Sequence, residues 1–144
     1  MGMTYRGTDV QTVNIFLDII RGFAEPADVR GIDTIIPGKH GRTERARKKD
    51  RRTILLEGWV SGTGASLVLK QQSWRTSTDA LMALMDRTLA SGSLVVTNPY
   101  MGLPAGSKTI SAKCVNLIPG PIVSMFHQKW SIELEAIGNP PDWA

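Results

Sequence analysis

The residues of this 144-residue chain that could perform acid–base, nucleophilic or metal chemistry are few and scattered. Its two histidines, His40 and His127, are far apart in sequence, and neither has the spacing of a metal ligand. The single cysteine, Cys114, alternates with Ala112 and Ile110, as a buried apolar side chain does, which favours a core position over a nucleophile. The pattern therefore predicts no catalytic residue, no metal site and no cofactor.

One glycine-rich segment, Gly62-Thr63-Gly64, invites comparison with a phosphate-binding loop. It lacks the third glycine of a dinucleotide fingerprint and the Gly-Lys-Ser/Thr ending of a P-loop. The segment predicts a tight turn between two regular elements.

The most distinctive charge pattern is a basic run from Lys39 to Arg52. It holds 8 of the 17 Lys and Arg residues and 2 of the 13 acidic residues, which leaves 9 basic and 11 acidic residues outside it. The chain is thus a mildly acidic body with a basic loop, and such a loop needs an acidic partner or water.

Three interpretations of this loop remain open from the residues alone. It could bind nucleic-acid phosphates, although it has no aromatic residue for stacking on bases. It could be a solvated hairpin. It could also be an arm that becomes ordered against the acidic body of a neighbouring subunit.

Alternating apolar residues predict strands on both sides of this loop and toward the C-terminus. The expected strands cover residues 13–19, 29–36, 53–60, 94–97, 109–117 and 130–136, with Pro119-Gly120-Pro121 as a corner. An apolar stripe of Trp74, Leu81, Leu84 and Met85 predicts one helix over residues 73–89, capped by Ser73 and ended by Gly92. Whether residues 67–69 form a short strand or the first turns of this helix is left open.

These elements predict a mainly β fold, an antiparallel β-sandwich or small barrel with one inserted helix and a long basic hairpin loop over residues 39–52. The length suits a single domain over residues 1–144, with residues 1–10 as an N-terminal arm. No apolar stretch is long enough to span a membrane, and no secretory signal is present at the N-terminus. The lone cysteine indicates a reducing compartment, the cytoplasm.

Large aromatic residues at expected edges and turns are candidates for interface anchors. They are Trp59, opposite the Ile54 and Leu56 face of its strand, Tyr100 at a hairpin tip, and Trp143 beyond the last strand. The alternative is that they cover the edges of a small core.

Several short motifs resemble the siphophage distal tail proteins, also called minor tail proteins in phages of actinobacteria. The resemblance covers the chain from about residue 10 to its end, and the motifs that carry it are Val29-Arg30-Gly31-Ile32-Asp33, the turn Ile36-Pro37-Gly38-Lys39-His40-Gly41-Arg42, the strand Asp50-Arg51-Arg52-Thr53-Ile54-Leu55-Leu56-Glu57-Gly58-Trp59-Val60, the corner Asn116-Leu117-Ile118-Pro119-Gly120, the strand Trp130-Ser131-Ile132-Glu133-Leu134-Glu135 and the ending Pro140-Pro141-Asp142-Trp143.

This resemblance implies a structural protein of the virion, made in the host bacterial cytoplasm, that forms a six-fold ring at the distal end of a tail tube. The ring would connect the tube to the tail hub or receptor-binding apparatus, with DNA passing through its lumen and no membrane contact. A tail tube or tail-completion subunit, and a nucleic-acid-binding domain, are the alternatives. Expected interface residues are Arg30, Pro37, Gly38, Gly41, Arg42, Arg45, Arg47, Lys48, Lys49, Arg51, Arg52, Trp59, Tyr100 and Trp143.

Overall fold

A computed structural model gives the fold. It describes residues 2–23, 29–30, 34–35, 42–43, 48–49, 52–97, 106–124, 126–138 and 143. The elements are β1 (Gly2–Tyr5), β2 (Thr8–Asp9), β3 (Ile15–Arg21), β4 (Val29–Arg30), β5 (Thr34–Ile35), β6 (Arg42–Thr43), β7 (Lys48–Lys49), β8 (Thr53–Ser61), α1 (Leu67–Leu84), β9 (Gly92–Thr97), β10 (Ser107–Ser124) and β11 (His127–Ala136).

The body is a seven-stranded antiparallel sheet in the order β2-β1-β9-β10-β11-β8-β3. Its long central strands follow the predicted alternation. In β8, Ile54, Leu56 and Val60 are buried, whereas Glu57 and Trp59 point to the opposite face. The predicted strands at residues 53–60 and 130–136 are therefore confirmed to within a few residues.

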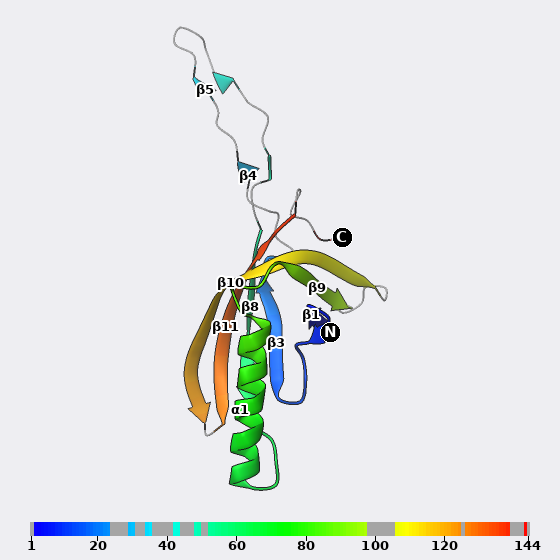
Figure 1. The fold of residues 1–144 in the computed structure, drawn as a ribbon. Helices are drawn as coiled ribbons and strands as arrows, with labels where there is room; N and C mark the ends of the chain where they lie inside the picture. The colour runs from blue at the N-terminus through cyan, green and yellow to red at the C-terminus, as the bar shows by residue number, and fades with distance from the viewer. Residues whose placement is uncertain are drawn as a thin grey trace.

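Strand β10 joins two layers of this sheet. It pairs with β9 through Ser107–Ala112 and with β11 through Ala112–Ser124, and it bends between these two halves (Figure 1). Register shifts lie between Cys114 and Asn116 and between Pro119 and Ile122. Such bulges let one strand turn from one layer into the other. The predicted corner at residues 119–121 was wrong, because the strand continues through it.

The N-terminal residues belong to the sheet. After β1, a turn in which Arg6 and Gly7 both have positive φ leads into β2, and β1 also pairs with β9. Met3, Tyr5 and Val10 are fully buried, and the Tyr5 hydroxyl donates to the Ala112 carbonyl at 3.2 Å. The segment expected as an arm thus contributes part of the core.

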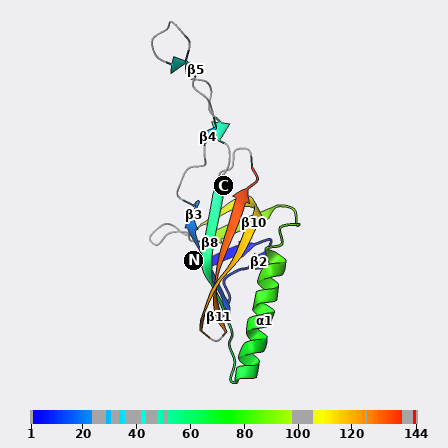
Figure 2. The same ribbon diagram turned by 90° about the vertical axis from the view of Figure 1, so that its left-hand side faces the viewer.

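The helix covers one face of the sheet, beside β8 and β3 (Figures 1 and 2). It begins earlier and ends earlier than predicted. Ser66, not Ser73, is its N-cap and accepts from the Leu69 amide, so residues 67–69 are the first helical turn. Beyond its C-cap at Met85, the Asp86 carboxylate accepts from the backbone amide and hydroxyl of Thr88, forming a turn instead of further helix.

One hydrophobic core lies between α1 and the two layers. Leu81 and Met85 of the helix stripe are buried in it, and Trp74 and Leu84 pack against it. The prediction of a mainly β fold with one inserted helix is confirmed.

Two short ribbons extend from the body between β3 and β8. Strand β4 pairs with β7, and β5 pairs with β6, both antiparallel, so the chain runs out and back as a long hairpin. β4 and β5 lie progressively farther from the sheet (Figures 1 and 2). We call the end of the body from which they extend the hairpin end.

Candidate assembly surfaces

The expected interface residues divide by how much the structure describes. Seven lie outside the described residues, namely Pro37, Gly38, Gly41, Arg45, Arg47, Arg51 and Tyr100. For four others, Arg30, Arg42, Lys48 and Lys49, the backbone is placed in β4, β6 and β7 of the hairpin. Arg52, Trp59 and Trp143 are described with their side chains.

Arg52 is a structural residue of the body. Its side chain is only 7% exposed, and its Nη1 donates to the Gly22 carbonyl at 2.9 Å. Its own carbonyl accepts from the Ala136 amide at 2.9 Å. The last residue of the basic run therefore anchors the base of the hairpin between β3, β8 and β11, which corrects the expectation that the whole run is an exposed loop.

Trp143 reaches the same carbonyl from the C-terminal segment. Its Nε1 donates to Gly22 O at 3.1 Å, and its ring packs on Phe23 with centroids 4.9 Å apart. Two donors separated by 91 positions thus meet on one acceptor. We call Gly22, Phe23, Arg52 and Trp143 the clasp.

Glycine is required at the acceptor position. Gly22 has φ +95°, and a Cβ there would lie 2.2 Å from the Thr53 carbonyl oxygen and 2.9 Å from Ile54 Cα. A side chain would meet the backbone of β8, which cannot move without breaking the sheet. Gly22 therefore lets the end of β3 approach the beginning of β8.

Trp59 lies on the face of the sheet opposite α1. It stacks on Phe16 with centroids 4.7 Å apart, and the His127 ring is 5.7 Å from it. Phe16, Trp59 and Lys129 form one cross-strand row over β3, β8 and β11. Both aromatic side chains are about two-fifths exposed, so the anchor position predicted for Trp59 is on an accessible face.

A groove of about 380 Å³ adjoins this aromatic pair. Ile118 and Pro121 form one apolar side of it, Trp59 forms another, and Glu57 and Lys129 supply one charge of each sign. An apolar depression with few polar groups on an exposed sheet face is suited to contact with another macromolecule.

Sequence reasoning missed two kinds of residue at these surfaces. Phe16 was detectable, because the period-two pattern of its strand places it with Asn14 and Asp18 on the side away from the core. Gly22 and Phe23 gave no local signal. Their role depends on Arg52 and Trp143, which come from distant parts of the chain.

The titratable groups give no sign of a reactive centre in the described part of the chain. Burial raises the pKa of the Cys114 thiol, which suits a core cysteine. Among residues that the structure describes, His, Cys, Asp and Glu form no cluster able to hold a metal ion. No described helix is long and apolar enough to cross a membrane.

A twisted antiparallel β body, with one helix packed on one face of its sheet and a long hairpin between β3 and β8, defines the architectural class. The Dit protein of phage SPP1, described as a paradigm of the hub adsorption apparatus in phages that infect Gram-positive bacteria, shares this fold. The TM-score is 0.65 at 16% sequence identity over 96% of this chain, which spans 50% of that protein. The distal-tail-like fold expected from the sequence motifs is thereby confirmed.

Two further solved structures have lower similarity. The tube-terminating cap of the anti-feeding prophage gives a TM-score of 0.49 at 14% identity, over 94% of this chain and 82% of that one. Hcp1 from Flavobacterium johnsoniae gives 0.35 at 14% identity, over 94% and 88%. No protein-family model and no curated protein matches the sequence.

Proposed function

We propose that this chain is a structural protein of a phage tail, six copies of which form a ring at the distal end of the tail tube. The ring connects the tube to the tail hub or receptor-binding apparatus. The observation that carries this proposal is the shared fold with the SPP1 Dit protein over nearly the whole of this chain. The role is architectural and needs no catalysis, and its location is the virion.

The open edges of the sheet support a ring. In the described part of the chain, β3 has a strand partner only in β8, and β10 from Lys113 onward pairs only with β11. These edges bound the same four strands, β10-β11-β8-β3, on opposite sides. Because the four alternate in direction, β3 of one copy would pair antiparallel with β10 of the next, a head-to-tail contact that can close.

Near the start of β3, groups of the preceding segment already form hydrogen bonds with backbone carbonyls of the strand. Thr12 N donates to the Ile15 carbonyl and Gln11 Nε2 donates to the Leu17 carbonyl. Beyond Leu17, the Ile19 amide donates to the Asp18 carboxylate at 2.9 Å, and in β10 the Asn116 carbonyl accepts from the Cys114 thiol at 3.5 Å. Both partners come from the same strand, so neither edge is covered there by another strand of the described chain. Pro119 and Pro121 end the usable part of the β10 edge, because proline has no backbone N–H.

The test is native mass spectrometry of the purified chain, with and without a short DNA duplex. A six-subunit species without DNA is the expected result. A monomer that binds the duplex in a salt-sensitive manner would contradict the proposal and make the basic hairpin a nucleic-acid-binding element. A series of stacked rings would instead support a tube subunit.

A further inference from the structure

The end of the body opposite the hairpin exposes apolar side chains from three separate segments. They are Val13 before β3, Leu67, Val68 and Leu69 at the start of α1, and Ile122 near the end of β10, each between 48% and 86% exposed. We call these five residues the apolar end. The turns that carry them lie together at the bottom of the body in Figure 1.

Hydrogen bonds hold these segments in place. Asn14 Nδ2 donates to Ser73 Oγ at 2.9 Å, and the Thr63 hydroxyl donates to Asn14 Oδ1 at 2.8 Å. Gly62 N donates to the Phe126 carbonyl at 2.8 Å, which ties the β10–β11 turn to the same loop. These hydrogen bonds therefore join the three segments that carry the apolar side chains.

Two glycines let the loop before α1 fold back onto the first helical turn. A Cβ at Gly62 would lie 2.2 Å from the Lys70 carbonyl oxygen, and one at Gly64 would lie 2.6 Å from Leu69 Cβ. The Gly-x-Gly turn thus fixes the exposed leucines in position. A surface that is ordered before it binds loses little conformational entropy on binding.

The helix start projects beyond the sheet. Residues 67–72 are all exposed, and burial on the core begins only at Ser73. In Figures 1 and 2 this part of α1 extends past the ends of β3, β8 and β11. No described part of this chain covers it, so its apolar side chains are available to another molecule.

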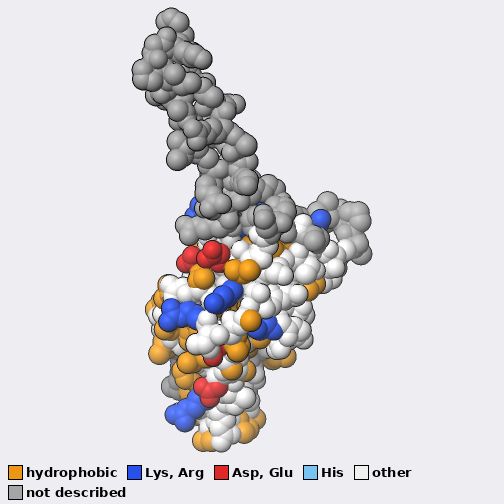
Figure 3. Space-filling model, turned by 45° about the horizontal axis from the view of Figure 1, so that its top comes forward, with side chains coloured by type: hydrophobic (Ala, Val, Ile, Leu, Met, Phe, Trp, Pro, Cys, Tyr) orange, Lys and Arg blue, Asp and Glu red, His pale blue; other side chains and the backbone are white. Residues whose placement is uncertain are grey.

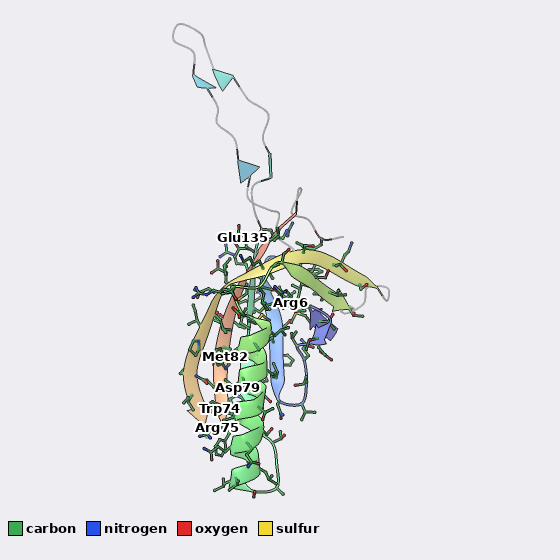
Figure 4. The ribbon with its side chains drawn as sticks, viewed as in Figure 1. Arg6, Trp74, Arg75, Asp79, Met82 and Glu135 are labelled. Carbon is green, nitrogen blue, oxygen red and sulfur yellow. The ribbon has the colours of Figure 1, made fainter. Side chains whose placement is uncertain are left out.

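The charged residues within the segments that form this end are basic, and the first acidic residue of α1 is Asp79. Residues 10–17, 58–78 and 118–132 contain no Asp or Glu, but they contain Lys70, Arg75 and Lys129. Figure 4 shows Arg75 and, one turn farther along, Asp79 on α1, with Glu135 at the far end of the body. Figure 3 shows acidic side chains at the hairpin end and also lower on the body. Pairing two apolar ends would bring cations together, so a symmetric contact between copies is disfavoured.

The position of the apolar end decides which partner can reach it. The orientation of this end within an assembly rests on the proposed function. If copies meet side by side through the edges of β3 and β10, the ends of these strands point along the ring axis. The apolar end then faces out of the ring, where no copy within the same ring can cover it.

We propose that the apolar end is the axial docking surface for a different tail protein, which presents an apolar patch bordered by carboxylates. The leucines and valines supply the buried area, and Lys70 and Arg75 select the acidic border.

Photo-crosslinking in assembled phage particles tests this proposal. The crosslinking amino acid p-benzoyl-phenylalanine replaces Val68 in one variant and Ile137, which is exposed beyond the end of β11, in a control variant. We expect position 68 to crosslink to a protein of another sequence, within a segment that contains Asp or Glu beside apolar residues. We expect position 137 not to crosslink to that segment.

Crosslinks from position 68 to a second copy of this chain, or none at all in particles that contain the variant, would overturn the proposal. Native mass spectrometry of the same variants separates this result from the proposed function. A ring that forms normally while position 68 fails to crosslink removes the docking surface and leaves the ring intact. An isolated chain that forms no ring refutes the ring itself.

A charge reversal gives a second readout. Lys70→Glu together with Arg75→Glu should leave the ring intact in solution and reduce incorporation of the chain into particles at least tenfold. Arg87→Glu together with Lys108→Glu is the matched control and should leave incorporation unchanged, because both residues are exposed, Arg87 lies beyond the C-cap of α1 and Lys108 lies in the half of β10 that pairs with β9. Equal incorporation of both double variants would count against electrostatic selection by this end.

Discussion

The two ends of the body differ in which kinds of side chain they bury and which they expose. At the hairpin end, a charged residue is buried, an aromatic residue from the C-terminal segment packs on Phe23, and both donate to the Gly22 carbonyl. At the apolar end, hydrogen-bonded polar residues lie beneath side chains that are apolar and exposed. Residue type alone would have assigned the charges to solvent and the leucines to the core. The difference is that side chains of the chain itself close the hairpin end, whereas the apolar end is the surface that we propose for a partner.

The largest loss of stability is expected from a substitution in the clasp. Gly22→Ala should destabilise the fold by roughly 3 kcal/mol, because it combines a positive φ with a backbone clash. Gly7→Ala is the matched control. Gly7 also has positive φ but has no atom within 4 Å of a Cβ, so its cost should be about 1 kcal/mol. Urea denaturation followed by circular dichroism measures both, and equal losses would refute a steric role for Gly22.

Arg52→Met should lower the free energy of unfolding by about 2 kcal/mol. The buried guanidinium donates to the Gly22 carbonyl, and methionine fills similar space without that bond. Arg21→Met, at an exposed position of β3, should change stability by less than about 0.5 kcal/mol. If the two substitutions had the same effect, Arg52 would belong with the solvated charges of the hairpin after all.

Trp143→Phe should cost about 1 kcal/mol, because it keeps an aromatic ring against Phe23 and removes the N–H donor to Gly22. Since Trp143 and Arg52 share one acceptor, their effects should not be additive. A double-mutant cycle with Arg52→Met should give a coupling of at least about 0.5 kcal/mol. Strict additivity would mean that the two donors do not act on the same carbonyl.

The smallest effect is expected at the apolar end. Val68→Thr should change stability by less than about 0.5 kcal/mol, since the side chain is exposed on the first helical turn. Leu81→Ala, on the buried stripe of the same helix, should cost about 2–5 kcal/mol. Thermal unfolding of the two variants measures the contrast. A large loss at Val68 would show that the helix start packs within its own chain.

The fold was predictable where local pattern and tertiary environment agree. The alternation of apolar and polar residues in β8 and β11 indicates a sheet with one buried face, and both strands lie at the expected places. The helix stripe was found for the same reason, but its beginning was misplaced. Ser66 and Ser73 are equally good caps, and exposed Leu67, Val68 and Leu69 do not continue the buried stripe.

The features that escaped prediction depend on contacts between distant residues. Arg52 belongs by sequence to a charged run, and its burial depends on partners such as the Gly22 carbonyl, which lies 30 positions away. The prediction of a corner at Pro119–Pro121 was wrong because β10 continues through these residues at an open edge of the sheet. There, the missing N–H of proline removes no hydrogen bond to a neighbouring strand. Of the interface residues expected from the family resemblance, those in the described part, Trp59 aside, turned out to lie at the base of the hairpin or in its ribbons.

The single buried thiol gives the protein an internal reporter. Cys114 is the only cysteine of the chain, it is 1% exposed, and burial raises its pKa. A thiol reagent should therefore label the unfolded chain rapidly and the folded chain only through unfolding, whether or not a ring is present. Because the folded thiol has the higher pKa, this residue's contribution to stability is complete below the pKa of the unfolded thiol and declines as the pH rises through the folded one. Labelling rates below that range would separate a variant that cannot assemble from one that cannot fold.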